Sequence, residues 1–110
     1  MKICQEDKDG VLVVRVTGDI DINTSPDVKK TFDRTISGKP QKVIINLKEV
    51  NYVDSSGLAT LVEILKNMRA NGGKLKISNL SQKVKGLFEI TRLDKLFDIS
   101  GEEQEAMESF

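Results

Sequence analysis

The first half of the chain is patterned as a β-hairpin followed by a buried strand. Residues 11–16 (VLVVRV) form a β-branched run after Asp9-Gly10, and residues 3–5 before this dipeptide are expected to pair with the run as a hairpin. Residues 42–47 (KVIINL) place apolar side chains in succession without polar alternation. Such a run is typical of a strand covered on both faces, so we expect it to be central in the sheet.

Three later segments have the apolar spacing of amphipathic helices. The first follows the hydroxyl caps and proline of residues 23–26 and is expected to end near Ser37, and the second runs from the corner at residues 54–58 to Asn71-Gly72-Gly73. Residues 79–81 are expected to cap the third. The expected inward-facing positions are Val28, Phe32, Thr35 and Ile36 in the first, Leu58, Leu61, Val62, Leu65 and Met68 in the second, and Val84, Leu87, Phe88 and Ile90 in the third.

The remaining segments complete a mixed α/β pattern. Residues 74–78 (KLKIS) alternate like an exposed or edge strand that pairs beside the central one. Leu93, Leu96 and Phe97 are expected to close the core, and residues 96–99 to form a short last strand. Residues 102–108 predict a final helix whose glutamates form a solvated face, anchored by Ala106, Met107 and Phe110. The chain is therefore expected to form a single α/β domain over residues 1–110, with a mixed sheet that opens with a hairpin and helices packed on it.

Charge and hydropathy argue against two classes of partner. Lys plus Arg and Asp plus Glu balance at 17 each, which gives no basic surplus for a nucleic-acid backbone. No apolar run approaches the ~20 residues of a membrane span, and the N-terminus is too polar for a signal peptide. We therefore expect a cytoplasmic protein that contacts neither nucleic acid nor membrane. Cys4 is the only cysteine and is expected to be a small buried hydrophobe without a function.

The chain lacks the side chains that most catalytic and metal sites need. It has no histidine, which removes His-dependent triads, imidazole acid–base catalysis and the common zinc sites. Asp19, Asp21 and Asp54 leave a carboxylate-bound magnesium site open in principle, although their spacing does not show that they converge. No phosphate-binding glycine loop is present. We expect neither enzyme activity nor a cofactor.

The segment Asp54-Ser55-Ser56-Gly57-Leu58 places two hydroxyls between the buried strand and the second helix. The first N–H groups of a helix lack internal partners and carry partial positive charge, so a phosphoryl group is stabilised there. Ser and Asp are also common helix caps, and Gly eases a tight corner. From spacing alone, capping and a regulatory phosphoserine both remain open.

Three motifs together resemble a known family. Residues 54–58 read DSSGL, residues 18–21 read GDID, and the weaker third match is VKGLF at 84–88 followed by LDKLF at 93–97. At this spacing the chain resembles the anti-sigma factor antagonists of the STAS-domain family, which are small bacterial proteins regulated by phosphorylation of a serine in the first motif. The resemblance implies the same α/β fold.

The resemblance also implies a phosphorylation switch. A partner anti-sigma factor with serine kinase activity would phosphorylate Ser55, and Ser56 is the less favoured acceptor because the family varies at that position. The unmodified protein would bind the anti-sigma factor and release a sigma factor, and a serine phosphatase would reset the modified form. The partner-binding residues are expected to be Asp21, Asn23, Asp54, Ser56 and Gly57.

Each of these positions also has a structural explanation. Asp54 is at least as well explained as a helix cap, Asp21 and Asn23 as a polar turn, and Gly57 as a site of close backbone approach. Two alternative functions remain: a constitutive STAS scaffold without a switch, and a phospho-aspartate receiver with Asp54 as acceptor. The initial hairpin and the absence of paired carboxylates after the first strand argue against the receiver. We expect a monomer, because no long exposed apolar face is evident.

Overall fold

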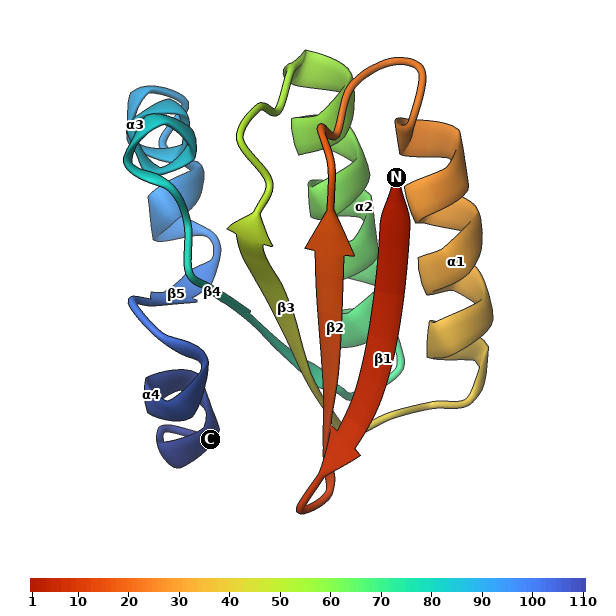
Figure 1. The fold of residues 1–110 in the computed structure, drawn as a ribbon. Coiled ribbons are helices and arrows are strands. Elements are labelled where there is room, and N and C mark those ends of the chain that lie inside the picture. Colours follow the sequence, from red (N-terminus) through yellow and green to blue (C-terminus); the bar gives the residue numbers. More distant parts are fainter.

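The computed structural model describes residues 1–110 and contains one five-stranded sheet in the order β1-β2-β3-β4-β5 (Figure 1). β1 pairs antiparallel with β2, and every later neighbour pairs in parallel. The mixed sheet that opens with a hairpin is therefore confirmed. The strands are β1 (Lys2–Lys8), β2 (Val11–Thr17), β3 (Lys42–Glu49), β4 (Lys74–Ser78) and β5 (Asp98–Ser100); the helices are α1 (Ser25–Ser37), α2 (Ser55–Ala70), α3 (Gln82–Ile90) and α4 (Glu103–Glu108), with a 3₁₀ turn at Leu93–Lys95.

A two-residue turn closes the first hairpin. Asp9 and Gly10 both have positive φ, 53° and 83°, which is the backbone of a type I′ turn. This turn matches the twist of the flanking strands and sets the register in which Lys8 pairs with Val11. The hairpin predicted from the Asp-Gly pair is therefore confirmed.

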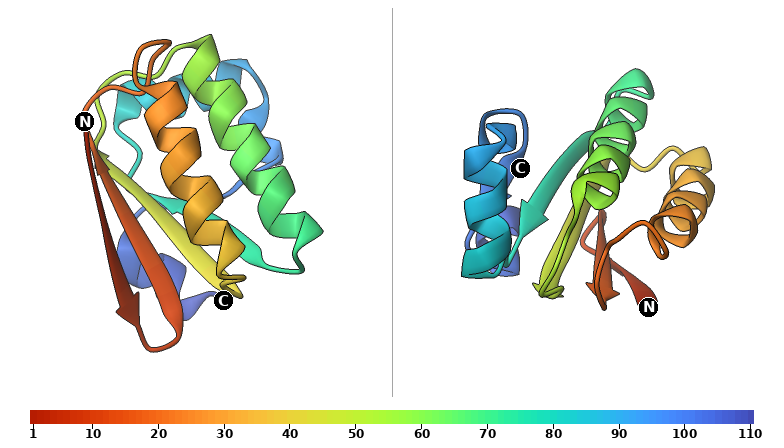
Figure 2. Two further views of the ribbon diagram at one scale, coloured as in Figure 1. Left: turned by 90° about the vertical axis from the view of Figure 1, so that its right-hand side faces the viewer. Right: turned by 90° about the horizontal axis from the view of Figure 1, so that it is seen from above.

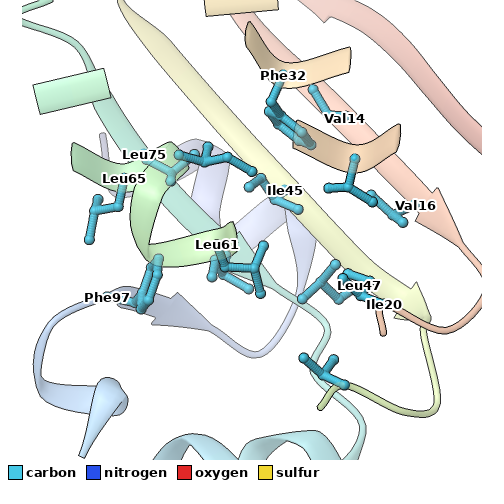
Figure 3. Close-up of a cluster of buried hydrophobic side chains, with 14 of the residues drawn as sticks. Val14, Val16, Ile20, Phe32, Ile45, Leu47, Leu61, Leu65, Leu75 and Phe97 are labelled. Carbon is cyan, nitrogen blue, oxygen red and sulfur yellow. The ribbon is translucent and has the colours of Figure 1, made fainter. Parts of the chain in front are cut away.

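The helices α1 and α2 lie side by side on one face of the sheet, as the left view of Figure 2 shows. This face carries a hydrophobic cluster of 21 buried residues, to which α3 and Phe97 also contribute. Figure 3 shows Phe32 of α1 beside the strand side chain Val14, and Leu61 of α2 near Ile45. The apolar face predicted for each of these helices accounts for this packing.

The opposite face of the sheet is covered by α4 alone. Val11, Val13 and Ile44 form a small buried cluster with Ala106 of α4, and Met107 and Phe110 pack against it. The predicted anchors of the last helix are confirmed. β3 is thus buried on both faces and occupies the middle of the sheet, as its continuous apolar run predicted.

Two predictions about the later strands and helices were wrong. The segment of β4 was expected to be exposed or at an edge, but it lies between β3 and β5, and the side chain of Lys76 is covered by the C-terminal residues Ser109 and Phe110. The acidic face of α4 was expected to be solvated. Glu102, Glu105 and Glu108 are exposed, but the expectation was wrong for Glu103, which turns toward the sheet and pairs with Arg15. Both differences come from C-terminal segments that the local pattern does not place, since β5 pairs with β4 and α4 covers one face of the sheet.

Three further side chains are more exposed than predicted. Cys4 is exposed rather than buried, because β1 is the edge strand and its outer face lies beyond α4. Ile90 was expected to face inward, but it ends α3 with 82% of its surface exposed. Leu96, which was expected to close the core, is 37% exposed, whereas Phe97 is buried. None of the helices is long and apolar enough to cross a membrane.

Candidate functional site

The two serines of the DSSGL segment are the first two residues of α2. Asp54 precedes them with extended backbone geometry and caps the helix, since its Oδ1 accepts a hydrogen bond from the Gly57 N–H at 2.9 Å. The capping explanation for Asp54 is therefore confirmed. A cap with this geometry fixes where α2 begins, and so it fixes the positions of both hydroxyls.

Asp54 also ties the corner to the loop that follows β2. Its second oxygen, Oδ2, accepts a hydrogen bond from the Ile22 N–H at 3.1 Å. The backbones of the two loops pair as well, because the Ile20 N–H donates to the Tyr52 carbonyl at 3.0 Å and the Asp54 N–H donates to the Ile20 carbonyl at 3.2 Å. The GDID and DSSGL motifs, more than 30 residues apart, thus form one rigid surface at the carboxyl ends of β2 and β3.

Gly57 is required by the closeness of these two loops. A Cβ placed on Gly57 would overlap the Ile20 carbonyl oxygen and would lie 2.8 Å from Cγ1 of Val53. Any side chain would therefore separate α2 from the loop after β2. The expected close backbone approach at Gly57 is confirmed, and it explains why Gly57 is buried while Ser55 is not.

Asp21 and Asn23 form a polar turn in front of α1. Asp21 Oδ1 accepts hydrogen bonds from the N–H groups of Asn23 at 2.9 Å and Thr24 at 3.0 Å. Asp21 is half-buried in this role, whereas Asn23 is exposed. The structure therefore gives Asp21 a turn-forming role, and it brings the exposed Asn23 into the same loop as Ile22, which contacts Asp54.

The two hydroxyl candidates differ in exposure. Ser55 is exposed at the start of α2, whereas Ser56 is half-buried. The helix geometry leaves the first N–H groups of α2 without internal acceptors, and the Asp54 cap satisfies only that of Gly57. The hydroxyl of Ser55 thus combines solvent access with nearby open N–H donors.

A groove of about 580 Å³ lies between this corner and α3. Ser55, Asp54 and Leu58 line one side, and α3 contributes the other. Two large apolar side chains on its rim are exposed, Tyr52 at 44% and Ile90 at 82%, and the Lys83 ammonium lies 5.6 Å from the centre of the Tyr52 ring. Sequence reasoning did not identify Tyr52 or Lys83 as site residues.

A signal for this groove was nevertheless present in the sequence. Ile90 is apolar at the end of a helix and was assigned to the core, and Ile22 is apolar within a polar turn and is 69% exposed. Ile22 fits no helix or strand period, and an apolar side chain of this kind is a candidate for an exposed contact. Both positions lie near Asp54. The Ile22 N–H donates a hydrogen bond to Asp54, and Ile90 lines the same groove as Asp54.

The three aspartates do not form a metal site. No group of three or more Asp, Glu or Cys side chains is placed so as to hold an ion. Both oxygens of Asp54 already accept backbone hydrogen bonds, and Asp21 is engaged within its own turn. The magnesium site left open by the sequence is therefore not assembled.

Comparisons with known proteins agree with this geometry. The family model for the STAS domain matches residues 3–106. The chain is 34% identical over 91 residues to the anti-sigma-B factor antagonist of Bacillus subtilis, covering 83% of each, and 29% identical over 108 residues to the anti-sigma F factor antagonist of Paenibacillus polymyxa, covering 97% of this chain and 92% of the relative.

A solved structure extends the agreement to the backbone. An anti-sigma factor antagonist from Mycobacterium paratuberculosis superposes with a TM-score of 0.90 at 26% identity, covering 98% of this chain and 92% of that one. The resemblance inferred from the three motifs is confirmed. Since the family model matches nearly the whole chain, the protein belongs to the STAS domain family, and its relatives are named anti-sigma factor antagonists.

Proposed function

We propose that this protein is an anti-sigma factor antagonist that binds an anti-sigma factor with serine kinase activity and is released when Ser55 is phosphorylated. The names of the relatives support the general role. Binding would free the sigma factor, and a serine phosphatase acting on phospho-Ser55 would reset the protein. These partners would place its action in the cytoplasm.

The observation that carries the proposal is the exposed Ser55 hydroxyl at the start of a rigidly capped helix. A kinase must reach its acceptor, and Ser55 is reachable without unfolding any element. Ser56 is the second choice because it is half-buried and follows Ser55 into the first turn of α2. Exposure and the family pattern therefore favour the same residue.

The binding surface in this proposal consists of the two tied loops and the groove beside them. Asn23 and Ser55 present polar groups on it, and Ile22, Tyr52 and Ile90 present exposed apolar groups. Asp21, Asp54 and Gly57 shape the surface from beneath through the turn, the cap and the close approach. A surface with apolar anchors beside a modifiable hydroxyl suits a regulated protein contact.

Phosphorylation would change the charge of this surface more than its shape. A phosphoserine adds about −1.5 to −2 charges and three strong acceptors. The open N–H groups at the start of α2 would stabilise the phosphate, so the fold need not rearrange. A partner seated on the apolar rim would have to desolvate the phosphate, which weakens binding.

The phospho-aspartate receiver is a poor fit. Asp54 would be its acceptor, but both carboxylate oxygens accept backbone hydrogen bonds that hold the two loops together. A receiver of the doubly wound type has strand order 2-1-3-4-5, whereas this sheet runs in sequence order with an antiparallel edge strand. The constitutive scaffold is the alternative that an experiment must separate.

Phosphosite mapping combined with binding measurements separates the switch from the scaffold. Protein isolated from its native cells is analysed by fragment masses that resolve Ser55 from Ser56. Binding to the anti-sigma factor of the same cells is then measured for Ser55→Ala, Ser55→Asp and the matched control Ser56→Ala. We expect phosphate on Ser55, retained binding with both alanine variants, and at least tenfold weaker binding with Ser55→Asp.

Three results would contradict this proposal in different ways. Equal affinities of Ser55→Ala and Ser55→Asp, together with no phosphate under several growth conditions, would identify a constitutive scaffold. Phosphate on Ser56 would keep the switch but reassign its residue. Absence of any binding to the anti-sigma factor by the unmodified protein would reject the antagonist function itself.

A further inference from the structure

The first strand leaves one edge of the sheet unpaired. β1 is seven residues long, pairs only with β2, and has mostly exposed side chains. Edge strands of this length offer a row of backbone donors and acceptors to another strand. The sequence predicted a monomer from the lack of an apolar face, but a strand edge pairs through its backbone groups.

The hairpin turn determines which backbone groups face outward. The type I′ turn joins Lys8 to Val11 as a hydrogen-bonded pair, and in an antiparallel ladder such pairs recur at every second residue. The N–H and C=O groups of Lys8, Glu6 and Cys4 therefore point to β2. Those of Ile3, Gln5 and Asp7 point away from the sheet and are free to bond a second strand.

Among the antiparallel registers of two β1 strands, only one bonds the outward backbone groups to each other and also places opposite charges across from one another without opposing like charges. Two copies whose helices lie on the same face can pair antiparallel about Cys4, which places Ile3 opposite Gln5 of the second copy, so that the outward groups bond each other. The same register places Lys2 opposite Glu6 twice. A register about Gln5 would instead oppose Lys2 to Lys8, and like charges directly opposite one another are destabilising.

The carboxylate in this pair is already held in a suitable position. Arg15 donates to Glu6 at 2.8 Å on the outer face of the hairpin. Lys2 lies on the same face and has no ion-pair partner within the chain, because residues of even number in β1 share that face. The second copy therefore supplies the missing carboxylate for Lys2.

We propose that two copies of this chain associate through their β1 edges, in antiparallel register about Cys4, to form one continuous ten-stranded sheet. The pairing leaves the groove beside α3 open, because β1 and α3 lie on opposite sides of the molecule along the sheet (Figure 1). Such a dimer would present two antagonist surfaces. The interface is a strand edge flanked by charges, so the association is weak and depends on salt.

Cys4 gives the proposal a direct readout. At the centre of the register the two Cys4 residues form a non-hydrogen-bonded pair with Cα atoms about 4.5 Å apart, within the range that disulfides span. Diamide would take two electrons and two protons from the two thiols and leave one disulfide. Because Cys4 is the only cysteine, any disulfide dimer joins the two Cys4 residues.

The experiment treats the purified full chain with diamide over a concentration series and measures its mass by sedimentation without oxidant. We expect a covalent dimer that requires Cys4 and a concentration-dependent dimer in sedimentation. Lys2→Glu, which places a second carboxylate opposite Glu6, should reduce both at least tenfold. The double variant Lys2→Glu, Glu6→Lys should restore them, whereas Lys66→Glu on α2 makes the same charge change away from the edge and should have no effect.

The register has its own control. In Cys4→Ser, Asp7→Cys the new thiol remains on the edge strand but lies opposite residue 1 of the second copy, so no disulfide dimer should form. Equal yields of disulfide dimer through positions 4 and 7 would show that the crosslink forms by random collision and would overturn the proposal. An unchanged dimer yield in the Lys2→Glu variant would overturn it as well. A monomer at all concentrations without a Cys4 disulfide would also overturn it.

Discussion

The two faces of the sheet are built in different ways. The face under α1 and α2 is a dry apolar layer of 21 buried residues (Figure 3). The face under α4 buries only four apolar residues and adds a charged network in which Glu103 accepts from Arg15 at 2.6 Å and from Asn46 at 2.8 Å. The face under α1 and α2 is stabilised mainly by buried apolar area, whereas the face under α4 is stabilised mainly by paired polar groups.

The difference shows what each face contributes to function. The apolar face includes the start of α2 and so fixes the corner that carries Ser55. On the other face, burial alone would raise the pKa of Glu103, but hydrogen bonds from Arg15 and Asn46 hold that pKa below its usual range. The same ion pair raises the pKa of Arg15. The α4 face thus stabilises the side of the sheet that does not carry Ser55.

The largest expected effect follows from removing a ring on the apolar face. Phe32→Ala leaves a cavity under α1 where the ring is fully buried, and we expect a loss of about 4 kcal/mol in the free energy of unfolding, measured by urea denaturation. Phe110→Ala is the matched change on the α4 face, where the ring is only half-buried and contacts the Lys76 ammonium. It should cost about 1 kcal/mol. Equal losses would contradict the difference between the faces.

A smaller loss is expected where the apolar face meets the functional corner. Gly57→Ala pushes α2 away from the Ile20 carbonyl, and we expect it to lower the free energy of unfolding by about 2–3 kcal/mol and to weaken binding to the anti-sigma factor. Gly86→Ala in α3 is the control, because no atom lies within 4 Å of its added methyl group. It should stabilise the protein by about 0.5–1 kcal/mol. Equal changes in the free energy of unfolding from the two variants would show that the close backbone approach at Gly57 does not contribute to stability.

A loss of about 1 kcal/mol is expected from Glu103→Gln at neutral pH, because the charge that Arg15 contacts is removed. Thermal melts of both proteins measure the effect. The exposed pair between Lys29 and Asp33 on α1 offers the comparison, and Asp33→Asn should leave the melting temperature unchanged. A larger effect from Asp33→Asn would mean that the α4 network is not the stronger of the two.

The smallest effect is the pH dependence of the same contact. A carboxyl whose pKa is lowered by folding stabilises the folded state above its unfolded pKa, and this contribution is lost as the pH falls through the folded pKa. The stability advantage of the wild type over Glu103→Gln should therefore be full at pH 7 and shrink from about pH 5 downward. An advantage that does not change with pH anywhere between neutral pH and strongly acidic pH would show that it does not come from the ionised carboxylate of Glu103.

Turn, cap and hydrophobic-pattern rules, which depend on neighbouring residues, predicted most of the helices and strands. Asp9-Gly10 specified the hairpin because only the left-handed conformations of both residues close a two-residue turn with the right twist. The cap at Asp54 and the stop after Ala70 bounded α2, and the run of residues 42–47 predicted a doubly covered strand. The candidate site was found for the same reason, since the DSSGL turn and its helix cap are local.

What the sequence determined by itself was the order of elements, the turn and cap chemistry and the position of Ser55, because each depends on neighbours within a few residues. Tertiary structure decided which surfaces are covered. It placed α4 over Lys76 and turned Glu103 toward Arg15, 88 residues away in the chain. It also left Ile90 exposed beside the groove, because the cover of a face comes from distant segments whose placement no local period encodes.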